Sequence, residues 1–169
     1  MIAARLKEIP AEFDALAVKA LLESAGISKK GDLWLKYPMN DLPWLTHVKL
    51  IECKKNGENF KWRVILVVET RGREIHMRFS FNSDEIKEAF YTTDPTNSVA
   101  KWGKRTVDAI KEGKVFVGMT KEQVIASWGL PDDKNEDMGR WGKHEQWIYR
   151  DNGAYLYIEN NRLTAIQKR

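Results

Sequence analysis

The hydrophobic residues of segment 46–81 recur with a period of two, and this alternation constrains the fold more than any other feature of the sequence. Such alternation is typical of half-buried β-strands. The strand-like runs cover residues 47–54, 60–70 and 73–81. Asn56-Gly57 separates the first two runs and Arg71-Gly72 the last two. Because Asn-Gly between alternating segments is a strong hairpin signal, we expect an antiparallel three-stranded meander.

Helical spacing flanks the meander. Residues 10–24 carry an apolar stripe that includes Leu16, which predicts an amphipathic helix. After the meander, residues 83–90 are expected to form a short helix, with Ser83 as its N-cap. The segment 29–43 mixes Gly and Pro with aromatic residues, and we interpret it as an irregular or short-strand connector.

The pattern changes after Asp94-Pro95, which we take as a domain boundary. A helical face covers residues 99–110, and Thr120 is expected to begin a second helix. Thr120 and Gln123 have the spacing of a capping box, in which two side chains satisfy free N–H groups of the first turn. Further strand-like runs follow at residues 145–150, 154–159 and 163–167.

These elements predict an α+β protein with two antiparallel sheets, and a hydrophobic fraction of 43% is sufficient for packed cores. We expect an N-terminal region at residues 1–95, made of one helix, the three-stranded antiparallel meander and a short helix. Residues 96–169 are expected to form a second domain with the element order ααβββ.

Two motifs in the second domain stand in an order and spacing known from one protein family. They are GMTKEQV at residues 118–124 and WGLP at residues 128–131. The runs at residues 145–149 and 155–160 also look like that family's first two strands. In this combination, residues 101–167 resemble the bacterial SmpA/OmlA (BamE-like) domain.

The resemblance implies a fold of two helices packed on a three-stranded antiparallel sheet, a layout similar to that of β-lactamase-inhibitor-like proteins. It also implies a non-catalytic module that binds other proteins, commonly in the bacterial cell envelope. The N-terminal region, residues 1–95, carries no comparable resemblance.

The sequence contains no arrangement of residues that is typical of a catalytic site. His47, His76 and His144 lack the spacing of metal ligands, and no glycine-rich phosphate-binding motif is present. Cys53 falls in a predicted strand, where a cysteine is usually a small buried side chain. The acidic run 132–137 lacks the residue order of a calcium loop, so we expect a solvated loop. We therefore expect no enzymatic activity, no cofactor and no metal.

Binding of nucleic acid is an alternative, because the chain has 28 Lys and Arg against 24 Asp and Glu. Basic residues lie along the meander, with Trp62, His76 and Phe79 between them. An exposed sheet face of that kind could stack bases. Phe79, however, is in phase with Ile75 and Met77, which are expected to face the core. Nucleic acid is therefore a less favoured partner than another protein, and its binding would be weak.

The candidate contacts for a partner protein are Arg140, Trp141, Tyr155 and Tyr157. Arg140 and Trp141 stand in a glycine-flanked loop expected between helix and sheet, and interfaces favour such a pair. Alternatively, Trp141 folds back over the sheet edge. Tyr155 and Tyr157 alternate with apolar residues, so an aromatic patch on the uncovered face is possible. The same loop could also insert into an enzyme, as in an inhibitor or an immunity-type protein.

The sequence is compatible with more than one cellular compartment. A single cysteine permits no internal disulfide, and this suits both reducing and oxidising compartments. The first residues lack the apolar segment of a signal peptide, so the sequence as given predicts a soluble, cytoplasmic protein. The family resemblance implies the periplasm or cell envelope instead. Membrane attachment is expected only if a lipidated leader was removed.

Overall fold

The computed structural model describes residues 11–28, 31–56, 63–80, 82–139 and 142–168. It confirms a mixed α+β architecture with two antiparallel sheets. The chain divides into two compact units, one of residues 1–33 with 47–93 and one of residues 34–46 with 94–169. The second unit therefore includes residues 34–46, which lie in the sequence between the two parts of the first unit.

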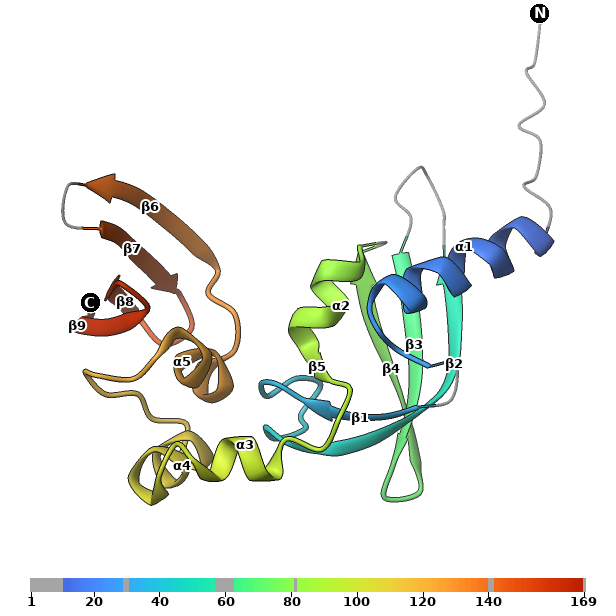
Figure 1. Cartoon of the computed structure of the whole chain (residues 1–169), viewed down its shortest axis with the longest axis horizontal. Helices are drawn as coiled ribbons and strands as arrows, with labels where there is room; N and C mark the ends of the chain where they lie inside the picture. The colour runs from blue at the N-terminus through green and yellow to red at the C-terminus, as the bar shows by residue number, and fades with distance from the viewer. Residues whose placement is uncertain (1–10, 29–30, 57–62, 81, 140–141, 169) are drawn as a thin grey trace, which may run out of the picture. The chain divides into compact units, whose positions relative to one another are not determined.

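The first sheet has five strands in the order β4-β3-β2-β1-β5 (Figure 1), and all of its residues except the last two of β1 belong to the first unit. The strands are β1 (Asp32–Leu35), β2 (His47–Asn56), β3 (Arg63–Thr70), β4 (Arg73–Ser80) and β5 (Phe90–Tyr91). Strands β2, β3 and β4 are the predicted antiparallel meander. The sheet has two strands beyond this meander. Strand β1 lies in the segment 29–43, for which a short strand was one of the two interpretations, whereas β5 was not predicted.

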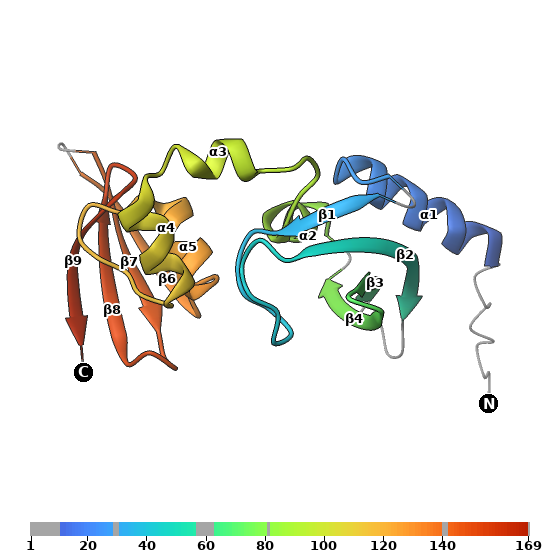
Figure 2. The same ribbon diagram turned by 90° about the horizontal axis from the view of Figure 1, so that it is seen from below.

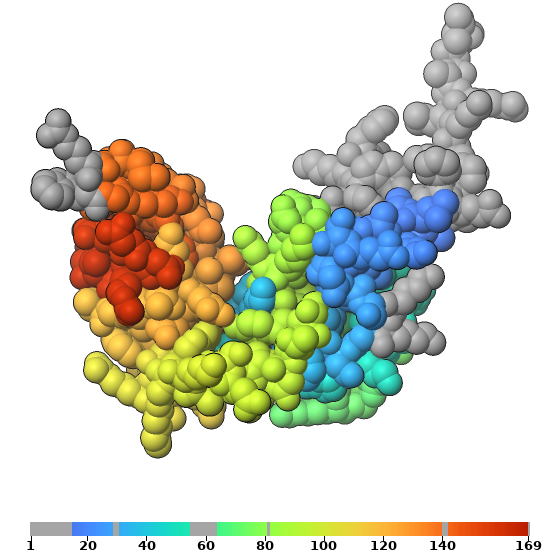
Figure 3. Space-filling view, in the orientation of Figure 1, coloured from blue at the N-terminus to red at the C-terminus, as the bar shows by residue number. Residues whose placement is uncertain are grey.

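Two helices, α1 (Ala11–Ser24) and α2 (Ser83–Ala89), contact each other and the sheet. Their atoms lie in front of the strands in the space-filling view (Figure 3). Leu21, which belongs to the predicted stripe, is buried, but Leu16 of the same stripe is 65% exposed, so the predicted stripe was wrong in part. Asn82, and not Ser83, caps α2, because its side chain accepts a 2.8 Å hydrogen bond from the Asp84 N–H.

The second unit contains the helices α3 (Thr96–Ala100), α4 (Lys104–Lys111) and α5 (Lys121–Trp128). Its strands are β6 (Asp133–Gly139), β7 (Gly142–Tyr149), β8 (Ala154–Glu159) and β9 (Arg162–Lys168). They form a four-stranded sheet with the order β6-β7-β8-β9, all pairs antiparallel.

The predicted order ααβββ was wrong in two places. The face expected at residues 99–110 is split between α3 and α4 at Gly103, whose φ of 81° is not helical. The acidic run expected to be a loop forms most of β6, which pairs with β7 along its whole length. In contrast, the capping box at the start of α5 is confirmed, with both hydrogen bonds between Thr120 and Gln123 present.

The core of the second unit lies between the helices and one face of its sheet (Figure 2). Trp147 and Leu156 of the sheet pack there with Val124 of α5. The segment 34–46 contributes Trp44, which stacks on Trp102 with 5.8 Å between the ring centroids. Within the part of the chain that the structure describes, no helix is long and apolar enough to cross a membrane.

Candidate functional site

The sheet of the second unit has one face against the core and one face that its helices leave uncovered, here called the open face. Burial alternates strictly along β8, where Leu156 and Ile158 are buried while Tyr155 and Tyr157 are half-exposed. The strand register extends this division to the neighbouring strands. The open face comprises Asp133, Asn135, Asp137, His144, Gln146, Ile148, Tyr155, Tyr157, Glu159, Arg162, Ala165 and Gln167.

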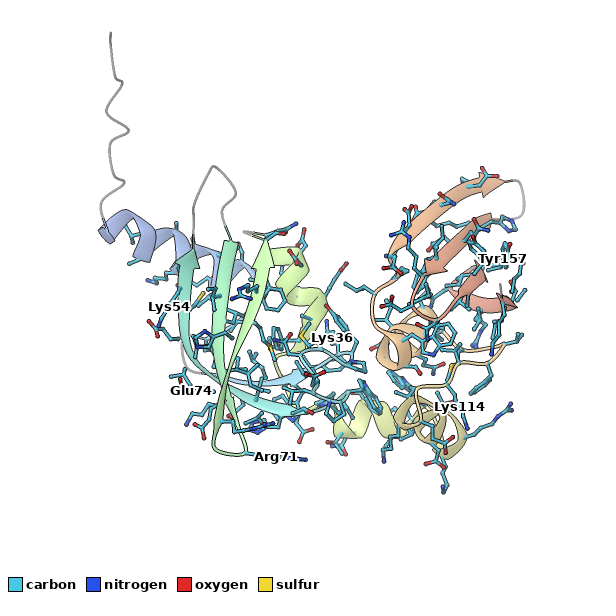
Figure 4. All side chains as sticks on the ribbon, turned by 180° about the vertical axis from the view of Figure 1, so that it is seen from behind. Lys36, Lys54, Arg71, Glu74, Lys114 and Tyr157 are labelled. Carbon is cyan, nitrogen blue, oxygen red and sulfur yellow. The ribbon has the colours of Figure 1, made fainter. Side chains whose placement is uncertain are left out.

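A chain of side-chain hydrogen bonds crosses the open face and takes one residue from each strand. Asn135 Nδ2 donates to Gln146 Oε1 at 3.0 Å, and Gln146 Nε2 donates to the Tyr157 hydroxyl at 3.1 Å. That hydroxyl donates in turn to Gln167 Oε1 at 2.8 Å. Figure 4 labels Tyr157 on β8. Because each amide and hydroxyl is oriented by its neighbour, the face presents fixed donors and acceptors.

The structure describes two of the four expected contact residues. Tyr155 and Tyr157 lie on the open face. Arg140 and Trp141 lie outside the described residues. Gly139 of β6 pairs with Gly142 of β7, so the segment between them joins two strands. The expectation that this segment connects a helix to the sheet was therefore wrong.

A hollow of about 220 Å³ lies on the part of the open face that β6, β7 and β8 form. Its walls include Asp137, His144, Tyr157 and Glu159. His144 Nδ1 lies 3.5 Å from Glu159 Oε1. The carboxylates of Asp133, Asp137 and Glu159 outnumber the one arginine among the described residues of this face, Arg162, so the open face is acidic although the whole chain has a formal charge of +4. A face of this charge attracts basic groups.

A buried carboxylate, Glu145, stands behind the open face on the core side of β7. It is 5% exposed and is contacted by the amines of Lys121 and Lys143. Burial alone would raise the pKa of Glu145, but hydrogen bonds from Lys121, Trp147 and Lys143 outweigh it and lower the pKa to about 2. The carboxylate therefore stays ionised and ties α5 to the sheet.

Cys53 and His76, both among the described residues, do not form a thiol–imidazole pair. Cys53 is opposite Leu66 and His76 is opposite Val67, so the two side chains lie on opposite faces of the first sheet. Burial, and secondarily Glu52, raises the pKa of the Cys53 thiol to about 11, which disfavours the reactive thiolate. In the described ranges, no group of three His, Cys, Asp or Glu side chains could hold a metal ion.

Phe79 faces the core of the first unit, as its phase with Met77 predicted. Phe79 is buried and packs against Phe90, with 5.8 Å between the ring centroids. The opposite face mixes basic and acidic side chains, because Lys54 and Arg78 share it with Glu52. This composition gives no uniformly basic track for a phosphate backbone.

The polar partners of Tyr157 were not predicted from the sequence. Gln146 alternates with the buried Glu145 and Trp147, and this phase would have placed it beside the tyrosines. Asn135 carried no signal, because every residue of β6 is exposed and the strand has no hydrophobic alternation. No protein-family model, curated protein or solved structure matches the chain.

Proposed function

We propose that the protein is a non-catalytic interaction module that binds a basic protein through the open face. The hydrogen-bonded chain from Asn135 to Gln167 is the observation that carries this proposal. Side chains that are already ordered lose little conformational entropy on binding, so such a face is suited to a protein surface. The two half-exposed tyrosines supply the amphipathic rings that interfaces favour.

Charge complementarity supports a basic partner. Asp133, Asp137 and Glu159 would pair with lysine or arginine side chains. The hollow beside Tyr157 is large enough to admit one such side chain, and a ring next to a cation adds a cation–π attraction.

The resemblance to SmpA/OmlA domains supports the same class of function. Helices α4 and α5 precede the sheet, as the family's two helices do. We propose that β7, β8 and β9 are the family's three strands and that β6 is an addition at the sheet edge. On this proposal, the cell envelope is the compartment in which a partner is sought first.

The test is co-purification from native lysate and envelope fractions with three forms of the protein. Wild type should retain a specific partner. Tyr155→Lys, which places a positive charge on the open face, should lose it. Lys104→Ala should retain it, because Lys104 is an exposed residue of α4. A partner that is retained equally by all three proteins would contradict the proposal, as would the recovery of no partner from either fraction.

A fourth protein, Trp141→Ala, distinguishes the inhibitor-type alternative. If this variant loses the partner while Tyr155→Lys retains it, the segment between β6 and β7 is the contact and the open face is not. A complex that weakens steeply with salt and contains RNA or DNA would instead favour binding of nucleic acid.

A further inference from the structure

A cavity of about 570 Å³ lies in the second unit, away from the open face. Its walls come from the segment 38–44, from the end of α4 and from Ser127 of α5. Pro38, Leu42 and Pro43 provide apolar surface. Small-molecule sites typically have volumes of about 300 to 1,000 Å³ and mostly apolar walls, so this cavity has the dimensions of such a site.

Trp44, which lines the cavity, carries a buried hydrogen-bond donor. Trp44 is 7% exposed, and its Nε1 has no hydrogen-bond partner among the described residues. Two other tryptophans of this unit do donate hydrogen bonds from their indole nitrogens. Trp128 Nε1 donates to the Gly113 carbonyl at 2.8 Å, and Trp147 Nε1 donates to Glu145 at the same distance. Unpaired buried donors are rare in folded proteins and often mark the place of a missing acceptor.

Two opposite charges stand at the same cavity. Asp41 occupies the turn of a tight hairpin, in which the Met39 and Leu42 backbones exchange hydrogen bonds of 3.1 and 2.9 Å. Lys111 lies on the last turn of α4. Neither side chain has an ion-pair partner within the described ranges. The cavity thus combines an apolar interior with Asp41 and Lys111, for which the described residues supply no ion-pair partner.

We propose that this cavity binds a small zwitterion with an apolar side chain, such as a free apolar α-amino acid. The ammonium group pairs with Asp41 and the carboxylate with Lys111. The apolar side chain rests against Leu42, Pro43 and Ile110. A ligand oxygen that reaches Trp44 Nε1, after a small shift of the wall, supplies the acceptor that this indole lacks. This proposal is independent of the function assigned to the open face.

The first experiment is calorimetric titration of the full chain with four compounds that share a phenylethyl group and differ in charge. They are L-phenylalanine, phenethylamine, 3-phenylpropionate and N-acetylphenylalaninamide. The first carries both charges, the next two carry one each, and the last carries none. We expect saturable binding of phenylalanine, at least about threefold tighter than any other probe, since each added ion pair at an exposed rim contributes modestly. Equal binding of all four, or no binding of phenylalanine up to millimolar concentrations, would overturn the proposal.

Matched variants locate the binding. Asp41→Asn removes the charge and suits the turn, because asparagine also tolerates the positive φ of 60° at this position. Lys111→Met removes the ammonium and keeps the helix. Each should weaken phenylalanine binding by at least about threefold. Lys104→Met on the same helix is the control and should leave binding unchanged. Binding that survives both cavity variants would show that the ligand sits elsewhere and would overturn the proposal.

The indole resonance of Trp44, identified by its loss in Trp44→Phe, gives a second readout. In ¹H–¹⁵N spectra of the wild type, phenylalanine should shift this resonance more than the corresponding signals of Trp128 and Trp147. Absence of any shift at Trp44 under saturating ligand would contradict the proposed position of the carboxylate.

Discussion

The indole Nε1 of Trp147 donates a hydrogen bond of 2.8 Å to Oε2 of Glu145, two residues earlier on the same face of β7. Lys121 from α5 and Lys143 from β7 contact the other carboxylate oxygen. A buried charge with this many donors is compensated, whereas removal of the charge takes the ion-pair partner from Lys121 and leaves Lys143 with Glu136 alone. The buried carboxylate is therefore a link between helix and sheet.

Glu145→Gln should lower the free energy of unfolding of the second unit by about 2 kcal/mol, because the amide keeps the size but loses both ion pairs. Urea unfolding followed by hydrogen exchange of the β7 and β8 amides measures this change. Glu136→Gln is the control, since the Glu136 side chain is 49% exposed and pairs only with Lys143 in the described part of the chain. A loss equal in the two variants would contradict the special role of the buried position.

The stability of the second unit should depend on pH through Glu145. Its pKa is about 2 in the folded protein and 4.5 for an unperturbed carboxyl, so the unfolded chain takes up the proton first. The stabilisation is complete above pH 4.5 and decreases as the pH falls from 4.5 towards 2. Unfolding of the wild type at pH 6 and pH 3 should show this loss, and in Glu145→Gln the loss should be much smaller. The same pH dependence in both proteins would assign the effect to other carboxyls.

Thr120→Ala should destabilise the start of α5 by about 1 kcal/mol, because the threonine oxygen then no longer accepts from the Gln123 N–H. Thr120→Ser keeps the hydroxyl and should stay close to the wild type. Thermal unfolding of the three proteins decides between these outcomes. An unchanged melting temperature in the alanine variant would mean that the capping box contributes nothing to stability.

Cys53 should react slowly with iodoacetamide while the protein is folded. With a pKa of about 11, instead of 9.0 for a free thiol, the thiolate population at pH 8 falls by roughly a hundredfold. Alkylation followed by mass spectrometry in buffer and in urea measures the ratio. Glu52→Gln should increase the rate modestly, because Glu52 contributes to the raised pKa, and Glu69→Gln is the control on the same sheet. Equal rates in the folded and unfolded protein would show that the thiol is not protected.

Strong local signals made part of the fold predictable. The alternation around Arg71-Gly72 identified β3 and β4, and the spacing of Thr120 and Gln123 identified the start of α5. Strand β6 was missed because it lies at a sheet edge with every side chain exposed. A strand that buries nothing needs only backbone hydrogen bonds, and these leave no hydrophobic period in the sequence.

The candidate sites are formed by contacts between residues that are distant in the sequence, and no local sequence pattern predicts such contacts. The phase of Tyr155 and Tyr157 on β8 could be predicted from alternation, and the structure places both on the open face. Their link to Gln167 is visible only once the register of β8 and β9 is known. The cavity beside Trp44 was out of reach, because its walls join residues more than sixty positions apart in the chain, such as Leu42 and Ile110.

The discontinuous second unit has a practical consequence for anyone dividing this protein. Residues 34–46 belong with residues 94–169, so a cut after Thr93 removes Trp44 from the fragment that begins at Asp94. Trp102 then loses its stacking partner and the cavity loses one wall. Exchange of this unit with that of another protein must therefore transplant two separate stretches of sequence, and expression of the C-terminal stretch alone would yield an incomplete core.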